Sequence, residues 1–162
     1  MVPMPYREMS DLQLLELAMY REARGEPTEG KRGVGHVIFN RSLTTSWWNY
    51  HRAGILANVI LFPYQFSSFD AGDPNANVWP QDDDTAFQEC CSIANSILHG
   101  VDPDITNGAT YYFDRSINWP TAWGAQSDYE ETLDVGRLRF FRLKPVNGNT
   151  AEEVQEASAD EN

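Results

Sequence analysis

Apolar side chains recur at helical spacing in the first part of the chain. Ser10 and Gln13 have the spacing of a capping box, so a helix is expected to begin there. The apolar stripe of this helix comprises Leu14, Leu15, Leu17 and Ala18. One further step of four residues reaches Glu22, which places this carboxylate on the core-facing side. Gly25 and Pro27 then end the helix.

A second helix is predicted after Pro27, with Thr28 as its cap. Its buried face is expected to contain Val34, Val37, Ile38 and Arg41. Gly33 and Gly35 lie within it, and each glycine costs about 1 kcal/mol relative to alanine in a helix. Two glycines in one turn therefore predict a close approach of another backbone, where this helix crosses the first.

Shorter elements and loops make up the rest of the pattern. A short apolar helix is expected over 53–61 and a longer one over 84–98, which Gly100 ends. The stripe of the longer helix comprises Phe87, Cys91, Ala94 and Leu98. Strands are predicted over 109–113 and 138–143, and loops over 42–54, 62–67, 70–84 and 114–127. This order predicts a mainly helical α+β domain with a small sheet.

The net charge of the chain is strongly negative. The 162 residues include 24 acidic and 12 basic side chains, which gives −12 at pH 7. Five of the acids lie beyond residue 146, so the remainder carries −7. The length fits one domain, which we place at 1–145. The small, polar and acidic composition of 146–162 predicts a disordered tail.

Charge and hydropathy exclude several classes of partner. No basic run is long enough to follow a phosphate backbone, so nucleic acid is not expected. No window reaches the roughly 18 apolar residues of a membrane span, and the N-terminus lacks the pattern of a secretion signal. Cys90 and Cys91 are neighbours, which disfavours a disulfide between them. We therefore expect a monomer made in the cytoplasm with reduced thiols.

The side chains able to carry chemistry favour a carboxylate mechanism. His36, His51 and His99 are far apart and match no metal-ligand spacing, so no metal or other cofactor is expected. No Gly-x-Ser-x-Gly motif is present. Five Trp, seven Tyr and eight Phe offer flat surfaces for the core or for sugar rings. A carboxyl among aromatic and amide groups suits glycosidic bond cleavage, in which a protonated Glu donates to the leaving oxygen.

Glu22 fits this chemistry. A carboxyl held at the mouth of a cleft by a buried helix is partly desolvated, which keeps it protonated near neutral pH. The same position also suits a structural acid at the buried edge, paired with Arg21 or Arg24. Helical spacing alone does not separate these two alternatives.

Five sequence blocks occur in order along the chain: Glu22–Pro27, Val37–Arg41, Gln65–Ser67, Gly108–Phe113, and Gly136 with Phe140–Phe141. Taken together, they resemble the catalytic domain of the SleB/CwlJ-type spore-cortex-lytic cell-wall hydrolases. Together they extend over roughly residues 12–143. The resemblance implies a lysozyme-like, lytic-transglycosylase-like single domain, mainly helical, with a small antiparallel sheet.

The resemblance also implies an activity. Members cleave peptidoglycan between N-acetylmuramic acid and N-acetylglucosamine with a single Glu as general acid and base, a role that falls on Glu22. In relatives that are lytic transglycosylases the muramic C6 hydroxyl attacks the anomeric carbon, so neither water nor a second carboxylate is required. The predicted substrate-binding residues are Gln65, Ser67, Tyr111, Tyr112 and Trp119.

The chain departs from the family pattern at two positions. Some members have His where this chain has Tyr111 and Leu138.

Glu26, Asp70 and Asp73 are candidates for a second carboxylate. For Glu26 a structural role is favoured, at the positive end of the next helix.

The functional alternatives are a binding module and a wall amidase or peptidase. A peptidoglycan-binding module without turnover would keep the aromatic groove and give Glu22 a structural role. A wall amidase or peptidase would need zinc or a Cys–His pair, which the sequence does not offer.

A domain without a signal is similar to a phage endolysin that reaches the wall through a holin pore, or to a virion component. A spore or cell-envelope enzyme is the rival setting.

Overall fold

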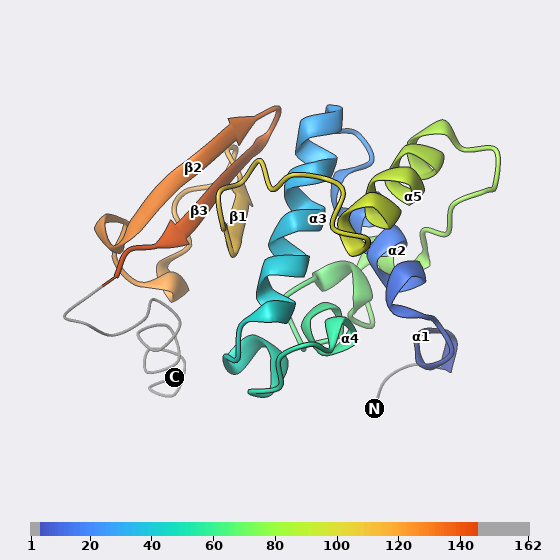
Figure 1. Cartoon of the computed structure of the whole chain (residues 1–162), viewed down its shortest axis with the longest axis horizontal. Coiled ribbons are helices and arrows are strands. Elements are labelled where there is room, and N and C mark those ends of the chain that lie inside the picture. Colours follow the sequence, from blue (N-terminus) through green and yellow to red (C-terminus); the bar gives the residue numbers. More distant parts are fainter. Residues whose placement is uncertain (1–3, 146–162) are drawn as a thin grey trace.

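Helices and one small sheet make up residues 4–145, the part of the chain that the computed structural model describes (Figure 1). The helices are α1 (Met4–Arg7), α2 (Asp11–Ala23), α3 (Thr28–Leu43), α4 (Leu56–Ile60) and α5 (Thr85–Leu98). The strands are β1 (Tyr111–Asp114), β2 (Tyr129–Val135) and β3 (Leu138–Leu143). Short 3₁₀ turns lie between them: η1 (Trp47–Asn49), η2 (Ser67–Phe69), η3 (Pro74–Asn77), η4 (Thr121–Trp123) and η5 (Gln126–Asp128).

Helix α3 lies between the sheet on one side and helices α2 and α5 on the other (Figure 1). Its two predicted glycines explain how it fits. A Cβ on Gly35 would lie 2.7 Å from Ile97 Cδ1 of α5 and 2.9 Å from Met19 Sδ of α2. A Cβ on Gly33 would lie 2.5 Å from Cζ of Phe140 on β3. The two glycines do mark close packing, but the groups that approach them are side chains of α2, α5 and β3 and not the backbone that was expected.

The capping box predicted for α2 is present. Ser10 Oγ accepts from the Gln13 N–H at 3.1 Å, and Gln13 Oε1 accepts from the Ser10 N–H at 2.9 Å. The buried apolar residues of this helix include the whole predicted stripe and two more: Leu14, Leu15, Leu17, Ala18, Met19 and Tyr20. Burial of this face fixes the direction in which the last turn, with Glu22, points.

The sheet has the strand order β1-β3-β2 and is antiparallel throughout. Tyr112 pairs with Phe140, so both side chains lie on the face that packs against α3. Tyr111 pairs with Phe141, and both therefore face the opposite way. The sheet thus presents Tyr112, and not Tyr111, to the helices.

Three expectations about elements need correction. Strand β2 was not predicted, because Glu130 and Glu131 give Tyr129–Val135 a polar pattern; both acids pair with arginines of β3. Helix α5 buries Cys90, Ile93, Ala94 and Ile97, so Ala94 of the predicted stripe is buried, whereas Phe87, Cys91 and Leu98 are only half-buried. The short helix expected over 53–61 forms only at Leu56–Ile60.

The predicted acidic tail, 146–162, lies outside the described residues. Within residues 4–145, no helix has the length and apolar character that crossing a membrane requires.

Candidate active site

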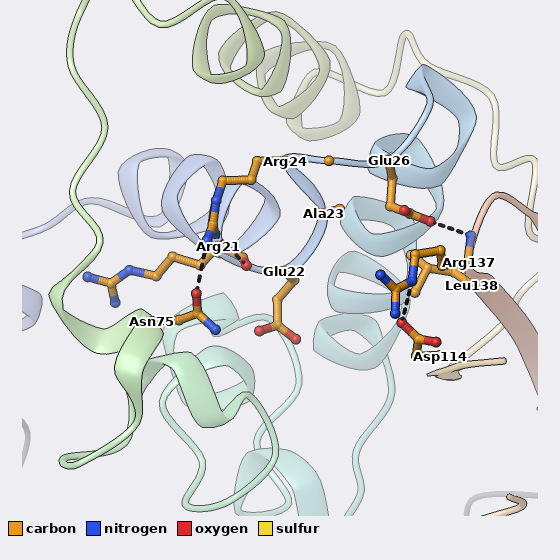
Figure 2. Close-up of a pocket in the computed structure, with 10 residues that line it drawn as sticks. Arg21, Glu22, Ala23, Arg24, Glu26, Asn75, Asp114, Arg137 and Leu138 are labelled. Carbon is orange, nitrogen blue, oxygen red and sulfur yellow. Dashed lines mark hydrogen bonds and ion pairs between the residues drawn. The ribbon is translucent and has the colours of Figure 1, made fainter. Parts of the chain in front are cut away.

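A cleft of about 370 Å³ opens beside the last turn of α2. Glu22 lines this cleft. The rest of the lining comes from the junction between α2 and α3, from η3, from the end of β1 and from the start of β3. Figure 2 shows Glu22 between two walls, one formed by Arg24 and Asn75 and the other by Asp114 and Arg137. Segments far apart in the sequence therefore meet at this carboxyl.

The Glu22 carboxyl has one direct partner among the described residues, the Tyr112 hydroxyl. Tyr112 Oη donates to Glu22 Oε1 at 2.5 Å. Burial raises the pKa of the Tyr112 phenol well above its usual range, and the neighbouring Glu22 raises it further. Tyr112 therefore keeps its proton and acts as the donor of this hydrogen bond.

Burial raises the pKa of Glu22, as expected for a desolvated acid. The hydroxyls of Tyr112 and Ser68 lower it, and the charge of Asp73 raises it. The net effect is a raised pKa, so Glu22 keeps its proton to higher pH than an exposed Glu does. The Ser68 hydroxyl is buried, yet its geometry completes no hydrogen bond with any described residue.

Arg21 holds the loop of residues 66–78 against α2. Its Nη1 donates to Tyr6 Oη at 2.8 Å and to the Ser68 carbonyl at 3.0 Å. Its Nη2 donates to the Ala76 carbonyl at 3.1 Å, and its Nε to the Val78 carbonyl at 3.0 Å. The side chain is 4% exposed. Arg21 thus does not pair with Glu22; it positions the loop that faces Glu22.

Arg24 does not pair with Glu22 either. Its Nη2 donates to Asn75 Oδ1 at 3.0 Å, and its Nη1 donates to the Arg21 carbonyl at 3.1 Å. The structural alternative for Glu22, an ion pair with Arg21 or Arg24, is therefore absent from the described part of the chain. Asn75 lines the cleft and Ser68 lies beside Glu22, and the sequence indicated neither, because long-range contacts of Arg21 and Arg24 bring their loop to α2.

The three candidates for a second carboxylate have different surroundings. Asp73 is the one whose charge acts on Glu22, and it also accepts from the Asn75 N–H at 2.8 Å. Asp70 accepts from the Tyr64 N–H at 3.2 Å. Glu26 Oε1 accepts from the Arg137 N–H at 2.7 Å, a structural contact to the β2–β3 turn, and the same side chain packs against Gly30 in the first turn of α3.

Of the predicted substrate-binding residues, Tyr112 reaches the Glu22 carboxyl. Gln65 is half-buried and accepts from Arg41 Nη1 at 3.4 Å, outside the lining of this cleft. Ser67 is exposed, and it is the next residue, Ser68, that faces Glu22. In a 3₁₀ turn neighbouring side chains point in different directions, so a shift of one residue changes the face.

Tyr111 is corrected, because it is buried in an aromatic cluster on the other face of the sheet, and the half-buried Trp119 packs in the same cluster. Tyr111 is fully buried, with ring centroids 4.9 Å from Trp123 and 5.2 Å from Tyr129. Trp119 lies 5.2 Å from Phe141 and donates from Nε1 to the Gly124 carbonyl. These rings stabilise the sheet and do not line the cleft.

Among the residues that the structure describes, no group of His, Cys, Asp and Glu side chains is arranged to hold a metal ion. The groups at the cleft are the Glu22 carboxyl, the Tyr112 and Ser68 hydroxyls beside it, and the guanidinium groups of the lining.

Comparison with known proteins identifies the family. The sequence model of the family described as Cell Wall Hydrolase matches residues 25–141. The chain belongs to the cell wall hydrolase family. This confirms the predicted enzyme class, a glycosidase-type cell-wall hydrolase, and the resemblance to the spore-cortex-lytic enzymes. The match begins three residues after Glu22, so it does not itself cover that residue.

Relatives and solved structures of this cell wall hydrolase family agree. The spore cortex-lytic enzyme of Bacillus subtilis (strain 168) is 33% identical over 116 residues, which is 71% of this chain and 33% of that protein. That of Halalkalibacterium halodurans is 34% identical over 112 residues, or 69% of this chain and 29% of that protein. The chain thus spans about a third of the length of these curated relatives.

Two solved structures share the fold. The catalytic domain of the Bacillus cereus SleB protein is 27% identical, with a TM-score of 0.58 over 82% of this chain and 89% of that one. The catalytic domain of the germination-specific lytic transglycosylase SleB from Bacillus anthracis is 25% identical, with a TM-score of 0.59 over 83% and 98%. The predicted fold class, a lysozyme-like α+β domain with a small antiparallel sheet, is confirmed.

Proposed function

We propose that this cell wall hydrolase cleaves peptidoglycan strands between N-acetylmuramic acid and N-acetylglucosamine, with Glu22 as its single general acid and base. The observation that carries the proposal is the raised pKa of Glu22 in a cleft, beside the Tyr112 hydroxyl. An acid whose pKa is raised keeps its proton to higher pH and can donate it to the glycosidic oxygen as the bond breaks.

The neighbours of Glu22 suit both stages of such a reaction. As the proton leaves, Tyr112 Oη donates to the carboxylate that remains and stabilises it. The positive charge that develops on the sugar is stabilised by nearby negative charge, which Asp73 and the ionised Glu22 supply. Glu22 then takes the proton of the nucleophile, either water or the muramic C6 hydroxyl.

Lysis of purified cell walls by isosteric variants tests the proposal. Glu22→Gln keeps the shape of the side chain but cannot donate a proton, so lysis should fall by at least a hundredfold with the fold retained. Glu16→Gln, on the same helix and away from the cleft lining, is the control and should lyse like the parent. If purified Glu22→Gln clears walls like the parent, the chain is a binding module or uses another acid.

The products identify the nucleophile. Mass spectrometry of released muropeptides should show muramic acid at the new ends, in the 1,6-anhydro form for a transglycosylase and the reducing form for a hydrolase. Free glucosamine ends would overturn the bond assignment. The monomeric state and the route to the wall, through a holin pore or as part of a virion, stay predictions.

A further inference from the structure

The cleft is lined by three guanidinium groups that differ in what they bind. Arg21 donates to Tyr6 and three carbonyls, and both terminal nitrogens of Arg24 are engaged. Arg137 forms one ion pair, from Nε to Asp114 Oδ2 at 3.1 Å. None of the described residues accepts from its Nη1 or Nη2, and its side chain is 68% exposed. Arg137 is therefore the cleft guanidinium with donors available to a ligand.

The backbone beneath Arg137 is fixed in place. Its N–H donates to Glu26 Oε1 at 2.7 Å, which ties the β2–β3 turn to the α2–α3 junction. The preceding Gly136 has a positive φ of 57°, and a Cβ there would lie 2.6 Å from Glu26 Oε1 and 2.9 Å from Pro27 Cδ. The turn thus sits directly on the segment that follows Glu22.

The ion pair with Asp114 also orients the side chain. Because Asp114 engages Nε, the two terminal nitrogens are left together at the free end of the guanidinium. Figure 2 shows this end extending from the turn toward the Glu22 side of the cleft. Two parallel N–H donors match the two oxygens of a carboxylate, and this geometry distinguishes arginine from lysine.

We infer that Arg137 binds a carboxylate of the muramic acid unit in the cleft and so sets which sugar of the alternating strand lies beside Glu22. The inference rests on the proposed function. Muramic acid bears a lactyl ether that ends in a carboxyl group, either free or joined to a stem peptide with carboxylates of its own. N-acetylglucosamine has no carboxylate. A guanidinium on one wall therefore discriminates between the two sugars and fixes which bond is cleaved.

Binding to the inactive Glu22→Gln protein, measured by calorimetry, tests this inference with three oligosaccharides of equal length. One carries stem peptides, one is peptide-free with the lactyl carboxylate exposed, and one is an N-acetylglucosamine oligomer without carboxylates. Adding Arg137→Gln should weaken binding of a carboxylate-bearing ligand roughly three- to fivefold, since the contact is solvent-exposed. Affinity for the carboxylate-free oligomer should not change. The ligand that loses affinity identifies the carboxylate as lactyl or peptide.

Arg142→Gln is the matched control, because Arg142 also lies on the β2–β3 hairpin and pairs with Glu130, on the strand next to it. It should leave all three affinities unchanged. Equal losses for the three ligands with Arg137→Gln, or no loss for any, would overturn the inference while leaving the proposed function intact. If the Glu22→Gln protein binds none of them and the parent releases no muropeptides, the proposed function itself fails.

Discussion

At the scale of single residues, the protonation of Glu22 results from opposed influences that substitutions can separate. Burial and the charge of Asp73 raise its pKa, whereas the Tyr112 hydrogen bond lowers it. In the proposed mechanism activity is lost as pH rises through this pKa, because the ionised form cannot donate. The alkaline limb of the pH–rate profile therefore reports on Glu22.

Asp73→Asn and Tyr112→Phe should move that limb in opposite directions. Asp73→Asn removes a charge that raises the pKa of Glu22, so the limb should shift to lower pH; Asn still caps η3. Tyr112→Phe removes a donor that favours the carboxylate, so the limb should shift to higher pH. The measurement is wall lysis from pH 4 to 9, with Asp70→Asn as the control. Shifts of the same sign, or none, would show that the titrating group is not Glu22.

At the scale of elements, the cleft depends on the attachment of residues 66–78 to α2, which Arg21 provides. Arg21→Leu would leave three carbonyls and the Tyr6 hydroxyl without their donor and should cost about 3 kcal/mol in the free energy of unfolding. Arg21→Lys keeps the charge but cannot reach all four acceptors, so its loss should be intermediate. Urea unfolding gives these values.

Activity adds a second measurement on Arg21. The loop carries Ser68, Asp73 and Asn75, so kcat of the folded variant should fall as well. Arg142→Leu, which removes an exposed ion pair on the sheet, should change stability by about 0.5 kcal/mol or less. An Arg21→Leu protein as stable and active as the parent would contradict the role assigned to this side chain.

The contact between the β2–β3 turn and the α2–α3 junction can be tested at Gly136. Gly136→Ala combines a positive φ with a clash against Glu26 and Pro27, so the loss of stability should be about 2–3 kcal/mol. Gly100→Ala also has a positive φ, but no atom lies within 4 Å of its Cβ position, so it should cost about 1 kcal/mol. Thermal unfolding of the two variants isolates the clash; equal losses would show that the contact contributes little.

Local patterns predicted the helices because an apolar stripe and a cap are properties of neighbouring residues. The capping box at Ser10 and the core-facing position of Glu22 follow from such spacing. The partner of Glu22 does not: Tyr112 is 90 residues away. Whether Tyr111 or Tyr112 faces the helices depends on the register with β3, where Phe140 packs on Gly33. That choice is made by tertiary packing.

The same limit applies to the missed strand and the cleft rim. The exposed Glu130 and Glu131 of β2 form ion pairs with Arg142 and Arg139 of the neighbouring strand β3. These polar residues therefore suit a strand only because of partners on another strand. Arg137 becomes a cleft residue only because the turn it occupies docks on Glu26. The spacing of residues along the chain does not reveal such contacts, although it did locate the Glu22 carboxyl that they surround.

At the scale of the whole molecule, a charge of −12 opposes association with an anionic wall. The screening length falls from about 30 Å at 0.01 M salt to about 8 Å at 0.15 M. Wall lysis should therefore speed up over this range, because repulsion is relieved. At higher salt the rate should decline, since the exposed Arg137 contact is screened as well.

Truncation after Pro145 separates the two effects. It removes five acids and leaves the body at −7, so lysis at low salt should be faster than with the full chain and its response to salt weaker. The turbidity of wall suspensions at several salt concentrations measures the lysis rate of both proteins, and a small carboxylate-free oligosaccharide serves as the uncharged control substrate.

The decline of the lysis rate at high salt should persist after truncation, because Arg137 is still present, and should vanish in Arg137→Gln. A rate that is flat between low and moderate salt, or identical curves for the two chains, would show that overall charge does not limit access to the wall.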